Sequence, residues 1–162
     1  MDEKEFLRNL KGCEGALFNF LLRTLNDREE AKEVMQTAVL KAWESRNGFE
    51  GRSQFKTWIF RIAINVAMDY LRRKKDLQVE LEIQEATQTP FDLLSQKEER
   101  QKLLKAIDQL PERQKRVLLL KIYGELKYSE IAALMGLTEG AVKAHFHNAV
   151  NRLKEVLKSD EV

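Results

Sequence analysis

The residues between positions 139 and 151 include several whose side chains can form hydrogen bonds to the edges of nucleic-acid bases. On a helix, these residues and Ala144 lie outside the apolar stripe and share one outer face, made of Glu139, Lys143, Ala144, His147, Asn148 and Asn151. Asparagine can pair bidentately with adenine, and lysine can reach guanine or a phosphate. A generic helical hairpin with a polar outer face has much the same spacing. The pattern therefore favours DNA binding, and a structural hairpin remains the alternative.

Two short amphipathic segments position these side chains. Ser129 is expected to cap a helix that runs through Met135, and Gly136 supplies the positive φ that ends it. Thr138 then caps a second helix, and this helix N-terminus can itself hold a phosphate. Its apolar stripe recurs at i, i+4, i+7 and i+11, at Val142, Phe146, Ala149 and Leu153. Two helices joined by a short turn with a glycine predict a helix-turn-helix, whose second helix enters the major groove.

A second group of candidate residues lies on a predicted helix over about residues 54 to 74. At 100° per residue the sequence leaves one narrow polar stripe, formed by Thr57, Arg61, Asn65, Asp69 and Arg72, with Trp58 at its edge. The remaining surface is mostly apolar, which is typical of the central helix of a small bundle. A loop that contains Gly48 and Gly51 precedes the helix and carries Phe49 and Arg52.

Charge is distributed unevenly around the end of this helix. Residues 52 to 75 hold seven Lys/Arg against one Asp, a net charge of +6, whereas residues 76 to 99 hold seven Asp/Glu against one Lys, a net charge of −6. A basic segment followed by an acidic one suggests a polyanion site next to a segment that avoids or imitates polyanions. Two solvated faces of opposite charge are the alternative interpretation.

Composition and periodicity predict an all-α protein. Seven Gly and two Pro are few for 162 residues, and helix formers are abundant. Residues 27 to 45 form one more amphipathic stripe, with Asp27 as its cap. We therefore expect two small helical domains, 1–76 and 96–162, joined by a flexible acidic linker over 77–95, with the helix-turn-helix in the second domain. The alternation over 79–83 leaves a short strand as a minor possibility.

Other classes of protein find little support. No apolar run approaches the roughly 20 residues that span a bilayer, and the N-terminus lacks the apolar core of a signal peptide, so we expect a cytoplasmic protein without membrane insertion. His145 and His147, at i and i+2, do not share a helix face, and no Cys or His cluster has metal-ligand spacing. The lone Cys13 has no partner for a disulfide. We predict no catalytic residue, metal or cofactor.

Three stretches of the sequence resemble blocks of a known family. Residues 110 to 157, LPERQKRVLLLKIYGELKYSEIAALMGLTEGAVKAHFHNAVNRLKEVL, look like region 4 of the bacterial sigma-70 family, which reads the −35 promoter element. Two further stretches resemble region 2, which binds RNA polymerase and melts the −10 element. They are DREEAKEVMQTAVLKAW and FEGRSQFKTWIFRIAINVAMDYLRRKK. With only these regions and a short linker, the chain is similar to the extracytoplasmic-function (group IV) sigma factors. The resemblance implies an alternative sigma factor, of the kind used in stress responses.

The resemblance also implies roles for individual residues of the first half. Contacts with the β′ clamp helices of polymerase fall on Glu33, Gln36, Thr37 and Leu40. The loop around Phe49, Arg52 and Ser53 corresponds to a pocket for a flipped base of the −10 strand. Further −10 contacts fall on Trp58, Arg61, Asn65, Arg72, Arg73 and Lys74. A splayed base needs an aromatic or apolar pocket with cationic neighbours, and this block has both; core packing is the alternative role for Trp58.

In the second half, the resemblance places −35 contacts on Thr138, Glu139, Lys143, Ala144, His147 and Asn148. It further implies binding to the β flap of core RNA polymerase, an anti-sigma factor as partner, and a linker that occupies a basic channel of polymerase. Family members often carry more cations around this helix, where the chain has Ala144, His145, Asn148 and Val150. Fewer cations predict fewer phosphate contacts and a weaker salt dependence of −35 binding.

One rival from another class is a conventional helix-turn-helix regulator whose N-terminal half dimerises or senses a ligand. Such a regulator binds promoters without RNA polymerase, whereas a sigma factor binds them well only as part of the holoenzyme. An enzyme is the weaker rival, because no Gly-rich phosphate loop follows a strand and no catalytic cluster is evident.

Overall fold

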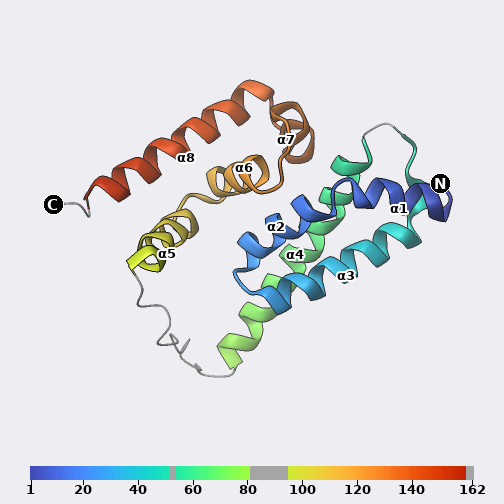
Figure 1. Ribbon diagram of the computed structural model, residues 1–162, viewed down its shortest axis with the longest axis horizontal. Coiled ribbons are helices and arrows are strands. Elements are labelled where there is room, and N and C mark those ends of the chain that lie inside the picture. Colours follow the sequence, from blue (N-terminus) through green and yellow to red (C-terminus); the bar gives the residue numbers. More distant parts are fainter. Residues whose placement is uncertain (52–53, 81–94, 160–162) are drawn as a thin grey trace.

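The computed structural model describes residues 1 to 51, 54 to 80 and 95 to 159. Within those ranges every regular element is a helix, and Figure 1 shows their course. In chain order they are α1 Glu3–Lys11, α2 Glu14–Leu25, α3 Arg28–Glu44, the short 3-10 helix η1 Arg46–Gly48, α4 Phe55–Glu80, α5 Ser95–Asp108, α6 Glu112–Ile122, α7 Tyr128–Met135 and α8 Glu139–Ser159. The predicted all-α fold is confirmed.

Helices α1 to α4 form the N-terminal group, in which α2, α3 and α4 run side by side (Figure 1). The largest side chains between them are almost completely buried: Leu17, Leu21, Val34, Ile59 and Phe60. Because α4 also contacts α1 and α7, it holds the central position that its narrow polar stripe predicted. Asp27 begins α3 as expected, since its carboxylate accepts a hydrogen bond from the Glu30 backbone N–H at 2.9 Å.

Helices α5 to α8 form the C-terminal group, in which α8 packs along α5, α6 and α7. The buried side of this group is apolar. The residues at 1% exposure or less there include Val117, Leu120, Leu126, Ile131, Val142 and Ala149. Helices α7 and α8 make the predicted helix-turn-helix. Gly136 ends α7 at a φ of 65°, and the Thr138 hydroxyl accepts a hydrogen bond from the Ala141 backbone N–H at 3.1 Å.

Two helix ends differ from the sequence prediction. Helix α7 begins at Tyr128, two residues earlier than a cap at Ser129 predicts, so Ser129 is not its cap. The Glu130 carboxylate instead accepts a hydrogen bond from the Lys127 backbone N–H at 2.8 Å. Helix α4 continues beyond Lys74 to Glu80, because the intervening charged and aliphatic residues are good helix formers. Val79 and Glu80 are therefore helical rather than part of a strand.

The rest of the predicted linker, residues 81 to 94, lies outside the described residues, so its flexibility stays a prediction. The two helix groups nevertheless touch each other directly, where α2 meets α6 and where α4 meets α7. Of the helices described, none is both long and apolar enough to cross a membrane.

Candidate nucleic-acid interface

The polar stripe of α4 is one exposed face of the N-terminal group. Arg61, Asn65 and Arg72 are exposed on it, as predicted, and Arg72 pairs with the carboxylate of Asp69 one turn earlier. Thr57 was predicted to share this face but is only 4% exposed, because the first turn of α4 packs into the helix group. The open stripe therefore begins one turn later, at Arg61, whose guanidinium also reaches the C-terminal group.

Three aromatic rings gather where the loop after η1 meets the first turns of α4. The ring centroids of Phe49 and Trp58 are 5.1 Å apart, and Phe55 lies 6.3 Å from the first and 5.8 Å from the second. All three side chains are half-buried, so the cluster contributes packing and still leaves ring surface open to solvent. Both interpretations of Trp58 thus fit the geometry. Arg52 and Ser53 lie outside the described residues.

The basic residues at the end of the stripe are not equivalent. Arg72 and Arg73 are exposed, whereas the Lys74 ammonium lies 2.7 Å from the carboxylate of Glu30, which is only 17% exposed. Partial burial, reinforced by the same carboxylate, raises the pKa of neighbouring Tyr70 to about 12. Lys74 is therefore part of a contact between α3 and α4, and the two arginines are the freer cations.

The outer face of α8 brings together the residues predicted from its periodicity. Glu139, Lys143, Ala144, His147, Asn148 and Asn151 are all exposed along its first turns. Val142 and Ala149 are fully buried against the C-terminal core, so the buried and exposed stripes are where the sequence placed them. Glu139 and Lys143 form an i, i+4 pair at 3.8 Å, which reduces the net charge of the face.

A cation and aromatic cluster beside this face was missed from the sequence. The Tyr128 ring packs edge-on against Phe146, with centroids 5.9 Å apart, and it lies 4.3 Å from the Lys121 ammonium and 5.8 Å from that of Lys143. The ring thus places lysines from α6 and α8 together. No periodicity within one helix could indicate the contact, because it joins three different helices.

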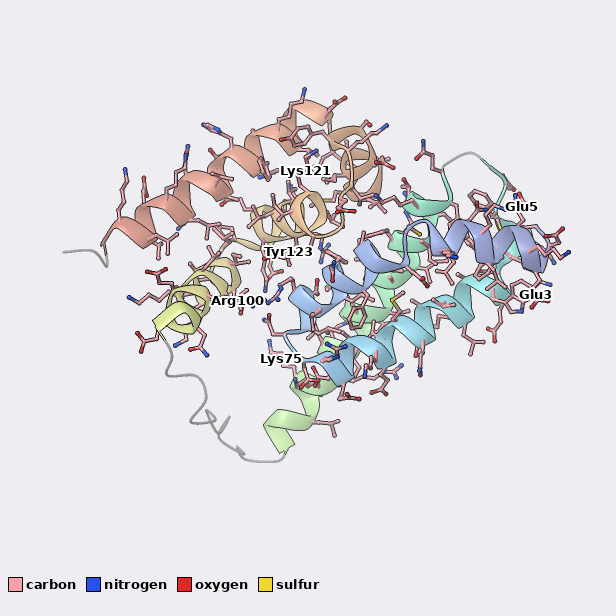
Figure 2. All side chains as sticks on the ribbon, in the orientation of Figure 1. Glu3, Glu5, Lys75, Arg100, Lys121 and Tyr123 are labelled. Carbon is pink, nitrogen blue, oxygen red and sulfur yellow. The ribbon has the colours of Figure 1, made fainter. Side chains whose placement is uncertain are left out.

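The outer face of α3 carries the third predicted set. Glu33, Gln36, Thr37 and Leu40 are all exposed, and Leu40 is 58% exposed despite being apolar. Beside Leu40 lies a largely apolar groove of about 660 Å³ between α1 and α3, lined by Glu3, Phe6, Leu7, Met35, Gln36, Val39, Leu40 and Trp43. Figure 2 labels Glu3 at the α1 side of this groove. Leu7, 53% exposed, is a member that sequence analysis did not single out.

The side chains on these faces are suited to noncovalent binding. Among the described residues no three His, Cys, Asp or Glu side chains gather closely enough to hold a metal ion. Cys13 is buried, and this burial raises the pKa of its thiol to about 11, so it is a poor nucleophile at neutral pH.

Comparison with known proteins shows which family the sequence matches. The family described as Sigma-70 region 2 matches residues 11–76, and Sigma-70, region 4 matches residues 100–153. The ECF RNA polymerase sigma factor RpoE of Cereibacter sphaeroides is 30% identical, over 95% of this chain and 87% of its own. RNA polymerase sigma factor YlaC of Bacillus subtilis is 34% identical, over 86% of this chain and 84% of its own.

Two solved structures share the fold. The sigma factor RpoE of Bartonella quintana, in complex with the anti-sigma factor NepR, superimposes with a TM-score of 0.72 at 28% identity, over 97% of this chain and 99% of that one. CnrH in complex with the cytosolic domain of CnrY gives a TM-score of 0.74 at 20% identity, over 98% and 91%, and so compares in fold alone.

The structure has two helical groups, and the second contains a helix-turn-helix. Together with the two family matches, this architecture defines a transcription initiation factor. The chain belongs to the sigma-70 family of RNA polymerase sigma factors, in the extracytoplasmic-function group. The predicted family is confirmed, and a regulator that acts without polymerase is not favoured.

Proposed function

We propose that residues 1–76 bind core RNA polymerase and the −10 element, that 77–95 link the halves, and that 96–162 bind the −35 element. The single observation that carries this division is the pair of exposed polar faces, on α4 in the N-terminal helix group and on α8 in the C-terminal one. The chain would act in the cytoplasm, where promoter DNA and polymerase are found.

At the −10 element, the Phe49 and Trp58 rings offer stacking surface to an unpaired base, and Arg61 and Asn65 follow along the strand. Arg72 and Arg73 are exposed and can neutralise phosphates, for which Arg72 would exchange its pairing with Asp69. Lys74 contributes less than the sequence suggested, because its ammonium is engaged by Glu30. Arg52 and Ser53 retain their proposed place in the base pocket through the family resemblance alone.

At the −35 element, α8 would enter the major groove with its first turns leading. Asn148 and His147 supply hydrogen-bonding groups for base edges, Ala144 an apolar contact, and Thr138 the helix N-terminus for a phosphate. Glu139 would set the position of Lys143 through their ion pair. The cluster around Tyr128 adds Lys121 as a second phosphate-binding lysine.

Core polymerase would be held through α3. Glu33, Gln36 and Thr37 provide polar contacts, and Leu40 marks the edge of the apolar groove, which fits an aliphatic side chain of a partner helix. The β flap of core polymerase would bind the C-terminal helix group. An anti-sigma factor is a further proposed partner, supported by the similarity to the sigma factor RpoE of Bartonella quintana, which was solved in complex with the anti-sigma factor NepR.

Run-off transcription from a library of random promoters tests the proposal. Bacterial core polymerase would be assayed with and without this protein, and with a chain that lacks residues 96–162. We expect transcripts that depend on the full chain and share two spaced sequence elements. Specific binding of duplexes by the protein alone, with no added transcripts, would instead establish the regulator.

A further inference from the structure

A small cavity lies between α2, α4 and α6, helices whose places Figure 1 shows. Its volume is about 90 Å³, roughly the share of three water molecules in the liquid. Apolar side chains from all three helices form its walls: Phe20, Met68, Leu71 and Leu119. The described residues that line it include none of those assigned above to promoter DNA or to core polymerase.

The guanidinium of Arg116 lines this cavity and has only a weak partner there. Arg116 is half-buried, and its Nη2 donates to the Met68 thioether sulfur at 3.1 Å. A thioether is a weak, uncharged acceptor, whereas a guanidinium carries five N–H donors. Within the described ranges no carboxylate forms an ion pair with Arg116, although Glu112 lies one turn earlier on α6. Because a cation partly removed from water is costly without an anionic partner, this site favours an anion.

The other polar groups at the cavity restrict which anion can enter. The Lys115 ammonium pairs with the Asp108 carboxylate at 3.2 Å, and the Thr24 hydroxyl donates to the Phe20 carbonyl at 2.9 Å. Both groups are thus engaged within the protein. Glu112 lines the cavity and is exposed, so its carboxylate lies toward solvent and repels a second negative charge on a ligand. The site therefore favours a monoanion over a dianion such as sulfate.

The walls behind Arg116 require a ligand with an apolar part. Phe20 and Leu119 are each 2% exposed, so the inner end of the cavity is hydrocarbon. An engineered cavity of about 150 Å³ holds a benzene ring, so the smaller volume here fits a tail of a few carbon atoms. An inorganic anion would leave these walls without contacts.

We propose that this cavity binds a small monocarboxylate with a short aliphatic tail, of the size of butyrate. The carboxylate would accept two parallel hydrogen bonds from Arg116, the geometry that a planar guanidinium and a carboxylate share. The tail would lie against Phe20 and Leu119. Since the walls come from both helix groups, a bound ligand contacts both and stabilises the folded chain.

Titration of the full chain with sodium butyrate tests the proposal. At an ionic strength held constant with sodium chloride, we expect saturable shifts of the methyl NMR signals of Leu71 and Leu119. Saturation should fall in the millimolar range, because so small a ligand makes few contacts. Sodium sulfate at the same ionic strength should leave these signals unchanged. A response to butyrate that does not saturate, or an equal response to sulfate, would overturn the proposal.

Two variants on α6 identify the group that binds the carboxylate. Arg116→Gln should weaken butyrate binding at least about tenfold, the loss expected when a charge-assisted hydrogen bond is removed. Arg113→Gln is the matched control, because Arg113 is exposed on the same helix and is not among the residues that line the cavity. Equal weakening in the two variants would mean that butyrate responds to the charge of α6 and not to this site.

A variant that fills the cavity provides a measurement that leaves Arg116 in place. Leu71→Phe adds a ring where the aliphatic tail would lie, so it should also weaken butyrate binding. Butyrate should raise the midpoint of thermal unfolding of the wild-type chain and of Arg113→Gln, and not that of Leu71→Phe. An unchanged wild-type midpoint at saturating butyrate would count against the site. These assays contain neither DNA nor polymerase, so the carboxylate site and the proposed function stand or fall separately.

Discussion

The ammonium of Lys74 and the carboxylate of Glu30 lie 2.7 Å apart and join the second half of α4 to the start of α3. Glu30 is 17% exposed, and one of its oxygens is buried without a hydrogen-bond partner. The pair therefore gives Lys74 a structural role that its two exposed neighbours in the basic run do not share.

Replacing Lys74 should lower stability more than it lowers DNA binding. Lys74→Ala leaves a mostly buried carboxylate unpaired, at a cost of about 1 kcal/mol in the free energy of unfolding once solvent screening is included. Arg73→Ala, its matched neighbour, should leave unfolding by urea unchanged and weaken holoenzyme binding to promoter DNA. Equal stability of the two variants would contradict the distinction.

Stability should fall at high pH through Tyr70. Its pKa is raised from 10.0 to about 12 in the folded protein, so the folded state retains the phenolic proton longer than the unfolded state does. The stabilisation is complete below pH 10 and is lost as the pH rises through about 12. Urea unfolding of the wild-type chain and Tyr70→Phe should therefore converge over this range. A constant difference between them would show that the hydroxyl does not titrate as stated.

The residues on and beside the outer face of α8 should separate into specific and non-specific contacts. Asn148→Ala should lose about 1–3 kcal/mol of discrimination at one position of the −35 element. Lys121→Ala should weaken all sequences alike and reduce the slope of log affinity against log salt by about 1. Holoenzyme binding to single-base variants of the element at several salt concentrations measures both effects. If the loss of affinity in Lys121→Ala depended on the sequence, Lys121 would not be a phosphate contact.

The apolar edge of α3 should contribute to the affinity for core polymerase and not to the stability of the fold. Leu40→Glu should weaken binding to core polymerase by about 2 kcal/mol or more, because it places a charge at the rim of an apolar groove. Leu77→Glu is the control, since Leu77 is 55% exposed, close to the 58% of Leu40, and lies outside the groove. Native-gel formation of holoenzyme should separate the two, and equal losses would place the contact elsewhere.

Substitutions on the α4 stripe should impair promoter opening more than polymerase binding. Asn65→Ala removes a group that faces solvent, whereas Arg61→Ala also removes a hydrogen bond to the Ala133 carbonyl of α7. Both variants should reduce permanganate reactivity of the −10 thymines while holoenzyme forms normally on a native gel. A parallel loss in both assays would mean that this face contacts polymerase instead.

Much of the fold was predictable because its signals are local. Asp27, Gly136 and Thr138 cap or end helices through their own side chains or φ, and the stripes of α3 and α8 follow from periodicity. Contacts between distant helices were not predictable in this way. The Lys74 pair with Glu30, the burial of Thr57 and the lysines around Tyr128 each depend on how separate helices meet.

The groove beside Leu40 also affects how the protein behaves when partners are scarce. Contiguous apolar surface on a monomer is a site of self-association unless another molecule covers it. Leu7 and Leu40 expose more than half of their surface at this groove. If core polymerase covers α3 as proposed, chains made in excess of polymerase would keep this groove exposed and would be prone to self-association.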